Sequence, residues 1–279
     1  MIGVVDVGGG LRDIYGSGIL DYCMDQGIQF DCCIGVSAGS ANMASYLAGQ
    51  RGRNYVFYTE YAFRREYMSF YNWVTQGSFV DLDYIYSTLS NDEGENPVDY
   101  DALAASEAKL FVVATDAETG EPVFFDKTHV RRNCYDILKA SSAIPVFCRP
   151  YVIDGKPYYD GGISCPIPVK EAFEAGCNRV VLILTRPADF IRTGKKDKPL
   201  SRLLNKKYPK AAEALRTRYK TYNDAIAALR PDIESGRVLL LAPDDCCGVD
   251  TLKKKKENLI RLYEKGYRDG EKITQWLEK

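Results

Sequence analysis

The sequence is poor in the residue on which Ser-His-Asp hydrolases depend, because its 279 residues include a single histidine, His129. A Ser-His-Asp site uses histidine as its general base. His129 stands in a polar stretch, residues 126–131, that is more typical of a surface loop than of an active site. We therefore expect any nucleophilic site in this chain to use an acidic side chain as its base.

Other features are also absent. No stretch approaches the roughly 18 to 20 apolar residues that span a bilayer, and the first residues resemble a strand instead of a signal peptide, so we expect a cytoplasmic protein. The net charge is only −1, which argues against a nucleic acid as partner. The nine cysteines are odd in number and lack the spacing of a zinc site, so we expect reduced thiols and no metal.

The most informative motif that is present is G-V-S-A-G at residues 35–39. An apolar run precedes it, and a run of small residues typical of a helix, 40–48, follows it. A sharp strand-to-helix turn exposes a serine hydroxyl, and Gly35 and Gly39 would relieve crowding around it. Ser37 is therefore the candidate nucleophile. The plain alternative is a glycine-serine turn that joins two core elements.

A glycine-rich loop follows the first apolar run of the chain. Gly8, Gly9 and Gly10 precede Leu11 and Arg12, and successive glycines let backbone N–H groups approach an anion closely. Arg12 could steady the loop or the anion. A dinucleotide site begins with a similar G-x-G-x-x-G motif, but here aspartate replaces its third glycine and the expected acidic partner is missing. The sequence thus predicts an anion cradle and no nucleotide cofactor.

A carboxylate that could serve Ser37 stands at Asp160, directly before Gly161 and Gly162. The preceding segment, 151–159, looks like a β-hairpin that turns at its Asp-Gly pair. Such a hairpin would carry Asp160 to a strand end and a tight, accessible loop. Without a histidine, this aspartate would take the proton from the serine directly. The alternative is an ordinary Asp-Gly-Gly turn.

Together the three motifs resemble the patatin-like phospholipase family in order and spacing, over most of the first two thirds of the chain. In that family a G-G-G-x-[KR] loop forms the oxyanion hole, a G-x-S-x-G serine is the nucleophile and a D-G-[GA] aspartate completes a catalytic dyad. The resemblance implies these roles for residues 8–12, Ser37 and Asp160, with an acyl-enzyme intermediate and no cofactor. Asp13 departs from the pattern, because many members have glycine there, and it bears on the shape of the oxyanion loop.

The substrate implied by the resemblance is a lipid ester, with phospholipid acyl hydrolysis as the leading assignment. A general carboxylesterase or acyl-thioester hydrolase would use the same motifs, and a lipid-binding protein could keep the fold without turnover. The many aromatic residues between 52 and 89 could line a groove for an acyl chain, or they could pack on the sheet as core.

The alternation of strand and helix patterns predicts an α/β fold. The resemblance specifies a three-layer α/β/α sandwich with a mostly parallel central sheet. We expect a catalytic core at residues 1–190, a basic helical excursion at 191–236, and a final strand with a C-terminal helix at 237–279. Within that last helix, Gly266 and Gly270 indicate a break or a kink.

Charge is unevenly distributed along the chain. Between Arg192 and Lys220 there are eleven basic and two acidic residues, whereas residues 81–121 hold eleven acidic residues and one lysine. The basic segment could dock the enzyme peripherally on an anionic membrane. Alternatively, it is a solvated helical face or pairs with the acidic segment.

Overall fold

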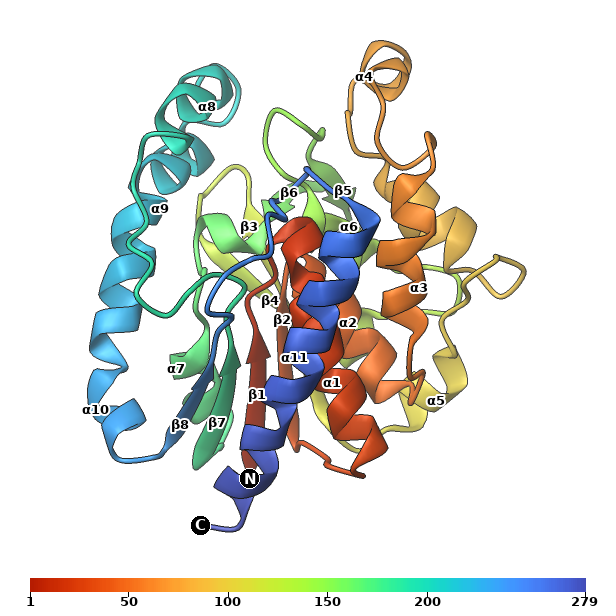
Figure 1. Cartoon of the computed structure of the whole chain (residues 1–279). Coiled ribbons are helices and arrows are strands. Elements are labelled where there is room, and N and C mark those ends of the chain that lie inside the picture. Colours follow the sequence, from red (N-terminus) through yellow and green to blue (C-terminus); the bar gives the residue numbers. More distant parts are fainter.

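A mixed sheet of eight strands runs through the centre of the computed structural model, which describes residues 1–279 (Figure 1). Its order is β5-β6-β3-β2-β1-β7-β8, and β4 also pairs with β3. The part from β3 to β8 is parallel, and β4, β5 and β6 add antiparallel pairings. The strands are β1 (Ile2–Asp6), β2 (Cys32–Val36), β3 (Lys109–Asp116), β4 (Pro122–Asp126), β5 (Tyr151–Ile153), β6 (Lys156–Asp160), β7 (Arg179–Ile183) and β8 (Val238–Leu241).

Helices cover both faces of this sheet. They are α1 (Ile14–Asp25), α2 (Ala38–Leu47), α3 (Arg53–Thr59), α4 (Phe70–Gln76), α5 (Tyr100–Ala105), α6 (Asp136–Ser142), α7 (Val169–Glu174), α8 (Asp197–Leu204), α9 (Pro209–Ala228), α10 (Arg230–Glu234) and α11 (Lys256–Leu277). Short turns of other helical types are η1 (Gly10–Asp13), η2 (Tyr61–Phe63), η3 (Tyr84–Leu89), η4 (Lys127–His129) and η5 (Gly161–Ile163).

The apolar residues of the parallel strands alternate between two hydrophobic cores. Val4 belongs to a cluster of 50 buried residues that includes side chains of α1, α2 and α11. Val5, its neighbour in β1, belongs to a cluster of 15 buried residues that includes side chains of α7 and α9. Because successive strand residues point to opposite faces, this division defines three layers. The predicted α/β/α sandwich is confirmed, with a sheet that is parallel in one part and antiparallel in the other.

The strands β2 and β6 pair with the same edge of β3. Residues 111–113 of β3 pair with both β2 and β4, so these two strands lie on opposite sides of it. Residues 114 and 115 pair with both β4 and β6, so β6 also lies opposite β4. The strand β6 therefore continues the line of β2 from the other direction. The last residues of the two strands meet, with Val36 opposite Val113 and Asp160 opposite Ala114.

The C-terminal helix α11 packs along α1, as Figure 1 shows. It runs through both of its glycines, so the predicted break is wrong. Close packing explains the glycine at 266, where an added methyl group would lie 2.0 Å from the Tyr15 carbonyl oxygen of α1. The glycine at 18 in α1 meets the backbone of α11 in the same way. The two helices approach closely because small residues face each other.

Several local predictions are confirmed. The hairpin of β5 and β6 turns at Asp154 and Gly155, both with positive φ, and His129 is an exposed residue of η4. The first long helix, α1, begins at Ile14, because η1 leads directly into it. The three-part division of the chain stays a prediction, although β8 is a strand of the same sheet. None of the helices combines the length and apolar character needed to cross a membrane.

Candidate active site

Ser37 and Asp160 are hydrogen-bonded to each other at the point where β2 and β6 meet. Ser37 Oγ donates to Asp160 Oδ2 over 2.6 Å, and both residues are buried. The fold therefore brings together the two side chains that the sequence predicts to act as a pair.

The backbone of Ser37 is held in an unusual conformation. Its φ of 57° and ψ of −130° are costly for a residue with a side chain. The surrounding turn is tight, because a methyl group on Gly35 would lie 2.4 Å from Ser40 Cα and one on Gly39 would lie 2.4 Å from Asp6 O. These two glycines relieve the crowding that the sequence predicts at this turn.

A second serine, Ser141, holds the turn in place. The backbone N–H of Ser37 donates to Ser141 Oγ over 2.8 Å, and this hydroxyl donates to Val113 O over 2.6 Å. Ser141 belongs to α6 and thereby links the turn to β3. Its contact explains why a polar residue is buried here, a role that the sequence does not reveal.

The carboxylate of Asp160 has a hydrogen-bond donor on each oxygen. Oδ1 accepts from the Gly162 N–H over 2.8 Å, and Oδ2 accepts from Ser37. Burial raises the pKa of Asp160, and the positive charge of Arg218, together with the hydrogen bonds from Ser37 and Gly162, opposes this rise. The arrangement suits a group that accepts a proton from Ser37, because its basicity exceeds that of an exposed aspartate.

The glycine loop of residues 8–12 borders the same site. The Gly8 N–H donates to Asp6 Oδ1 over 3.1 Å, and the Leu11 N–H donates to Thr251 O over 3.1 Å. The amides of Gly9 and Gly10 have no hydrogen-bond partner within the chain. They are the two groups of the loop that are free to bind an anion.

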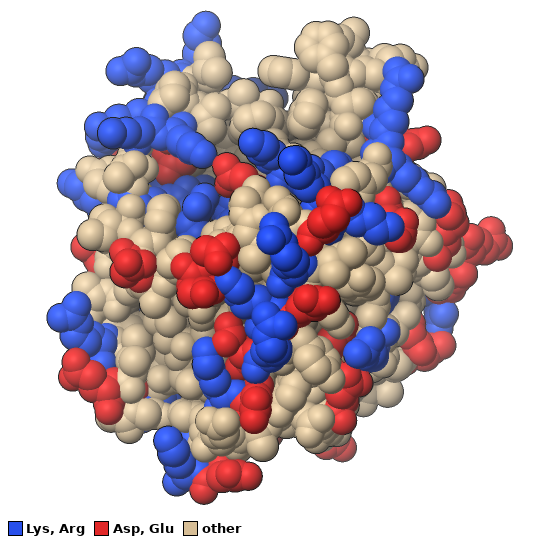
Figure 2. All heavy atoms as spheres, viewed as in Figure 1, with Lys and Arg blue, Asp and Glu red and all other residues tan.

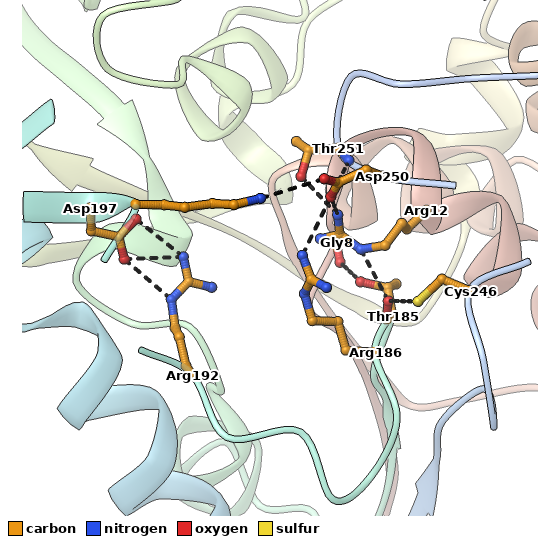
Figure 3. Close-up of polar contacts among 10 residues, drawn as sticks. Gly8, Arg12, Thr185, Arg186, Arg192, Asp197, Cys246, Asp250 and Thr251 are labelled. Carbon is orange, nitrogen blue, oxygen red and sulfur yellow. Dashed lines mark hydrogen bonds and ion pairs between the residues drawn. The ribbon is translucent and has the colours of Figure 1, made fainter. Parts of the chain in front are cut away.

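Arg12 anchors the loop instead of facing Ser37. Its guanidinium donates to Thr185 O over 3.1 Å, to Asp250 Oδ1 over 2.8 Å and to Thr251 Oγ1 over 2.7 Å. Figure 3 shows Arg12 and Arg186 converging on Asp250, while Thr185 contacts the carbonyl of Gly8. Of the two roles that the sequence allows Arg12, the structure supports that of steadying the loop.

Comparison with known proteins agrees with this geometry. The chain matches the family model described as Patatin-like phospholipase over residues 7–173, more than half of its length. The chain belongs to the patatin-like phospholipase family. A second model, described as Domain of unknown function (DUF6363), matches residues 208–279.

Two individual proteins are similar to this patatin-like chain. "Uncharacterized protein YjjU" of Escherichia coli (strain K12) is 34% identical over 208 residues, which cover 73% of this chain and 57% of that protein. The crystal structure of VipD from Legionella pneumophila matches with 16% identity and a TM-score of 0.48, covering 99% of this chain and 66% of that chain. The chain thus spans less than two thirds of the length of each.

Asp13, the departure from the family pattern, is buried next to another aspartate. A methyl group on Gly16 would lie 2.6 Å from Asp6 Oδ2 and 2.8 Å from Asp13 Oδ1, so the two carboxyl groups are neighbours. Asn42 donates to Asp6 Oδ2 over 3.0 Å, whereas no protein donor reaches the side chain of Asp13. Burial and the charge of Asp6 raise the pKa of Asp13 well above its ordinary value.

Two cavities of this patatin-like fold meet at Ser37 and Gly10. We call the first the apolar pocket; it measures ≈ 60 Å³, and its lining is mostly hydrophobic, including Phe57, Tyr58, Tyr67, Leu82, Ile144 and Leu252. The second, the polar cavity, measures ≈ 590 Å³ and reaches both Ser37 and Asp160. Six basic side chains line the polar cavity, namely Arg12, Arg186, Arg192, Lys196, Arg218 and Lys253.

The predicted basic segment does not form one surface. Arg192, Lys196 and Arg218 line the polar cavity, whereas most basic residues of the segment, Lys196 included, are exposed. The exposed ones are Lys195, Lys196, Lys198, Arg202, Lys206, Lys207, Lys210, Arg216 and Lys220. The sequence gives no sign of this division, because arginines that face inward and outward stand on the same helix, α9.

The aromatic residues between 52 and 89 include some that line a cavity and some that are exposed. Phe57, Tyr58 and Tyr67 line the apolar pocket. Phe70 and Trp73 of α4 neither line a groove nor belong to the core, since 71% and 44% of their surfaces are exposed.

No group of three or more His, Cys, Asp and Glu side chains is placed to hold a metal ion.

Proposed function

We propose that this chain is a serine-dependent lipid acyl hydrolase in which Ser37 is the nucleophile and Asp160 the general base. The observation that carries the proposal is the 2.6 Å hydrogen bond from Ser37 Oγ to Asp160 Oδ2 inside a strained strand-to-helix turn. A hydroxyl becomes an effective nucleophile when an adjacent base accepts its proton. Asp160 is the acceptor in contact with it.

In the first step, Ser37 Oγ attacks the ester carbonyl and its proton passes to Asp160. The carbonyl oxygen becomes an oxyanion, and the unpaired amides of Gly9 and Gly10, which line the same cavity as Ser37, are the donors that would bind it. Loss of one such donor typically costs about 3 kcal/mol of transition-state stabilisation. Asp160 then gives its proton to the departing alcohol.

The acyl group is now bound to Ser37 as an ester. A water molecule replaces the alcohol, and Asp160 takes a proton from it as it attacks the acyl carbonyl. Collapse of the second tetrahedral intermediate releases the carboxylic acid and returns the proton to Ser37. The two cavities support this sequence, because the apolar pocket offers room for acyl carbons and the polar cavity offers room for the leaving alcohol.

One observation favours a second candidate, a carboxylesterase for short acyl chains. The apolar pocket, at ≈ 60 Å³, is far smaller than the polar cavity, at ≈ 590 Å³. A long acyl chain would need the pocket to widen or the chain to leave it. A series of substrates that differ only in chain length distinguishes the two candidates.

A lipid surface is the partner that we propose for the end of the molecule that carries α4 and α8. Both helices project at the end to which the parallel strands point, opposite the termini (Figure 1). In α4, Phe70, Trp73 and Val74 are exposed, and aromatic residues favour membrane interfaces. Figure 2 shows Lys and Arg gathered over α8 and mostly uncharged side chains over α4.

The basic side chains around α8 and the exposed apolar side chains of α4 would act together. Each basic residue near an anionic membrane contributes about 1 kcal/mol, and four exposed ones are found in or next to α8: Lys195, Lys196, Lys198 and Arg202. The aromatic residues of α4 would enter the interface beside them. Such docking would turn the polar cavity toward the lipid, because Leu200 of α8 and Lys196, the residue before this helix, line that cavity.

The test is hydrolysis of p-nitrophenyl esters and fluorogenic phospholipids by the wild type and three variants. We expect Ser37→Ala and Asp160→Asn each to lower kcat/KM by about 10³-fold or more. Ser45→Ala is the matched control, because this serine lies on the same helix, α2, and bonds to Asn54. Retention of activity in Ser37→Ala would overturn the assignment. An inactive but lipid-binding wild type would favour a binding protein without turnover.

A further inference from the structure

Arg218 is a cation without a partner beside the proposed base. It projects from α9, and a methyl group on Gly162 would lie 3.0 Å from Arg218 Nη2 and 3.1 Å from Asp160 Oδ1. The guanidinium nevertheless forms no ion pair and no hydrogen bond within the chain, and its Nε is shielded from solvent. A shielded donor without a partner is unfavourable. The site is therefore suited to an anion that the chain itself does not supply.

Asp160 is not the anionic partner of Arg218. Its Oδ2 already accepts from Ser37 and its Oδ1 from Gly162, which leaves Arg218 outside ion-pair distance. Burial, together with the nearby guanidinium of Arg192, lowers the pKa of Arg218 to about 10, although the charges of Asp160 and Asp197 oppose this shift. Arg218 thus stays charged at neutral pH, and Arg192 and Arg186 are cations near it.

Two further arginines line the polar cavity near Arg218. Arg192 is paired with both carboxylate oxygens of Asp197, at 3.2 Å for the closest contact. Arg186 is only partly neutralised, because it contacts Asp250 at 3.4 Å and this carboxylate is already engaged by Arg12 at 2.8 Å (Figure 3). Six basic and three acidic side chains line the whole cavity. The cavity therefore has an excess of positive charge next to the proposed nucleophile, and guanidinium groups bind phosphate oxygens in a planar, two-pronged geometry.

We propose that Arg218, assisted by Arg192 and Arg186, binds a phosphate group of the substrate on the leaving-alcohol side of the scissile ester. The inference rests on the proposed function, since Ser37 defines where the ester lies. The polar cavity then holds the phosphorylated alcohol and the apolar pocket the acyl carbons. The substrate class that fits is a glycerophospholipid, in which the phosphate and the ester share one glycerol unit. Free inorganic phosphate has the same chemistry and is the other source that the test must separate.

The first arm of the test measures binding without turnover. Isothermal titration of the wild type uses sn-glycerol 3-phosphate and, separately, inorganic phosphate. We expect glycerol 3-phosphate to bind more tightly, and Arg218→Gln to weaken it at least about tenfold. Arg216→Gln is the matched control, because it removes an exposed arginine from the same helix and should leave the Kd unchanged. Equal affinity for both ligands, or an unchanged Kd in Arg218→Gln, would overturn the subsite.

The second arm measures selectivity with dissolved substrates, so that membrane docking plays no part. It compares a short-chain phosphatidic acid below its critical micelle concentration with the diacylglycerol of the same chains, at a pH where each variant is fully active. We expect Arg218→Gln to lower the phosphate-to-neutral ratio of kcat/KM at least about tenfold, mainly through KM. An equal loss on both substrates would mean that Arg218 acts only on Asp160, and the subsite would be rejected.

A second variant protects the test against misfolding. Arg192→Gln changes a residue at the cavity wall and should weaken glycerol 3-phosphate binding in the same direction as Arg218→Gln. If neither folded variant affects binding, the subsite is rejected. If the wild type binds glycerol 3-phosphate through these residues but hydrolyses no ester, the subsite stands and the proposed hydrolase function fails.

Discussion

Val36 and Asp160 end their strands opposite consecutive residues of β3, Val113 and Ala114. This register places the residue after Val36, Ser37, in hydrogen-bond contact with Asp160. A pair formed in this way depends on the pairing of three strands and not on a flexible loop. The preorganisation of the site is therefore a property of the sheet.

The first prediction concerns the pH dependence of catalysis. Asp160 must be ionised to accept a proton, and burial raises its pKa, so kcat/KM should fall with decreasing pH at a higher pH than for an ordinary aspartate. Arg218 is the largest influence that lowers this pKa. The variant Arg218→Gln should therefore move the acid limb to higher pH, while Arg216→Gln leaves it in place. A pH-rate profile on a neutral ester checks both statements.

The motifs of the site could be predicted from the sequence because each is local. The Ser37 turn, the Asp160 hairpin and the glycine loop are contiguous segments whose glycine positions report the backbone geometry directly. The long α/β alternation likewise predicts the layers. The in-line arrangement of β2 and β6 could not be predicted, since it depends on which edge of β3 each strand takes.

The second prediction concerns Asp13 and stability. Its pKa is raised in the folded state by burial and by Asp6, so the folded protein holds a proton that the unfolded chain releases above its ordinary pKa. Stability from this group is thus lost as the pH rises above the unfolded value. In the variant Asp13→Asn, residue 13 cannot ionise, so the free energy of unfolding does not fall with rising pH on its account.

We therefore expect Asp13→Asn to be more stable than the wild type at pH 8, with a gain that shrinks toward pH 4. Urea unfolding at several pH values measures the difference in the free energy of unfolding. A gain independent of pH would show that Asp13 does not hold an extra proton in the folded state.

The third prediction concerns the contact between α1 and α11. Gly266→Ala places a methyl group 2.0 Å from the carbonyl oxygen of Tyr15, a backbone atom that cannot move without shifting α1. We expect the free energy of unfolding to fall by about 3 kcal/mol, the upper part of the range for overpacked cores. Glu264→Ala, an exposed change in the same helix, should alter it by less than about 0.5 kcal/mol. Equal effects of the two changes would disprove the close contact.

The fourth prediction concerns membrane docking. The chain has two tryptophans, and only Trp73 is substantially exposed, at 44% against 7% for Trp276. Vesicles with anionic lipid should shift the tryptophan emission to the blue, and Trp73→Ser should weaken binding about tenfold. Arg202→Gln in α8 should weaken binding more than Lys272→Gln in α11, which lies outside the proposed surface. Binding that is insensitive to both α4 and α8 would argue against this surface.

The inward arginines and the outward aromatic residues could not be predicted for a related reason. Arg218 and Arg216 stand two positions apart in α9, and the sequence does not specify which side of the helix meets the sheet. Phe70 and Trp73 have the same apolar character as Phe57, but only packing decides that α4 projects from the core. Both distinctions depend on tertiary contacts that local patterns do not contain.

The most direct test of the central claim is covalent labelling with a fluorophosphonate, followed by mass spectrometry of the digested protein. The account predicts one adduct, on the peptide that contains Ser37, and a labelling rate that falls strongly in Asp160→Asn while Ser45→Ala reacts like the wild type. An adduct on another serine, or labelling that Asp160→Asn does not slow, would contradict the assignment of Ser37 and Asp160 as nucleophile and base.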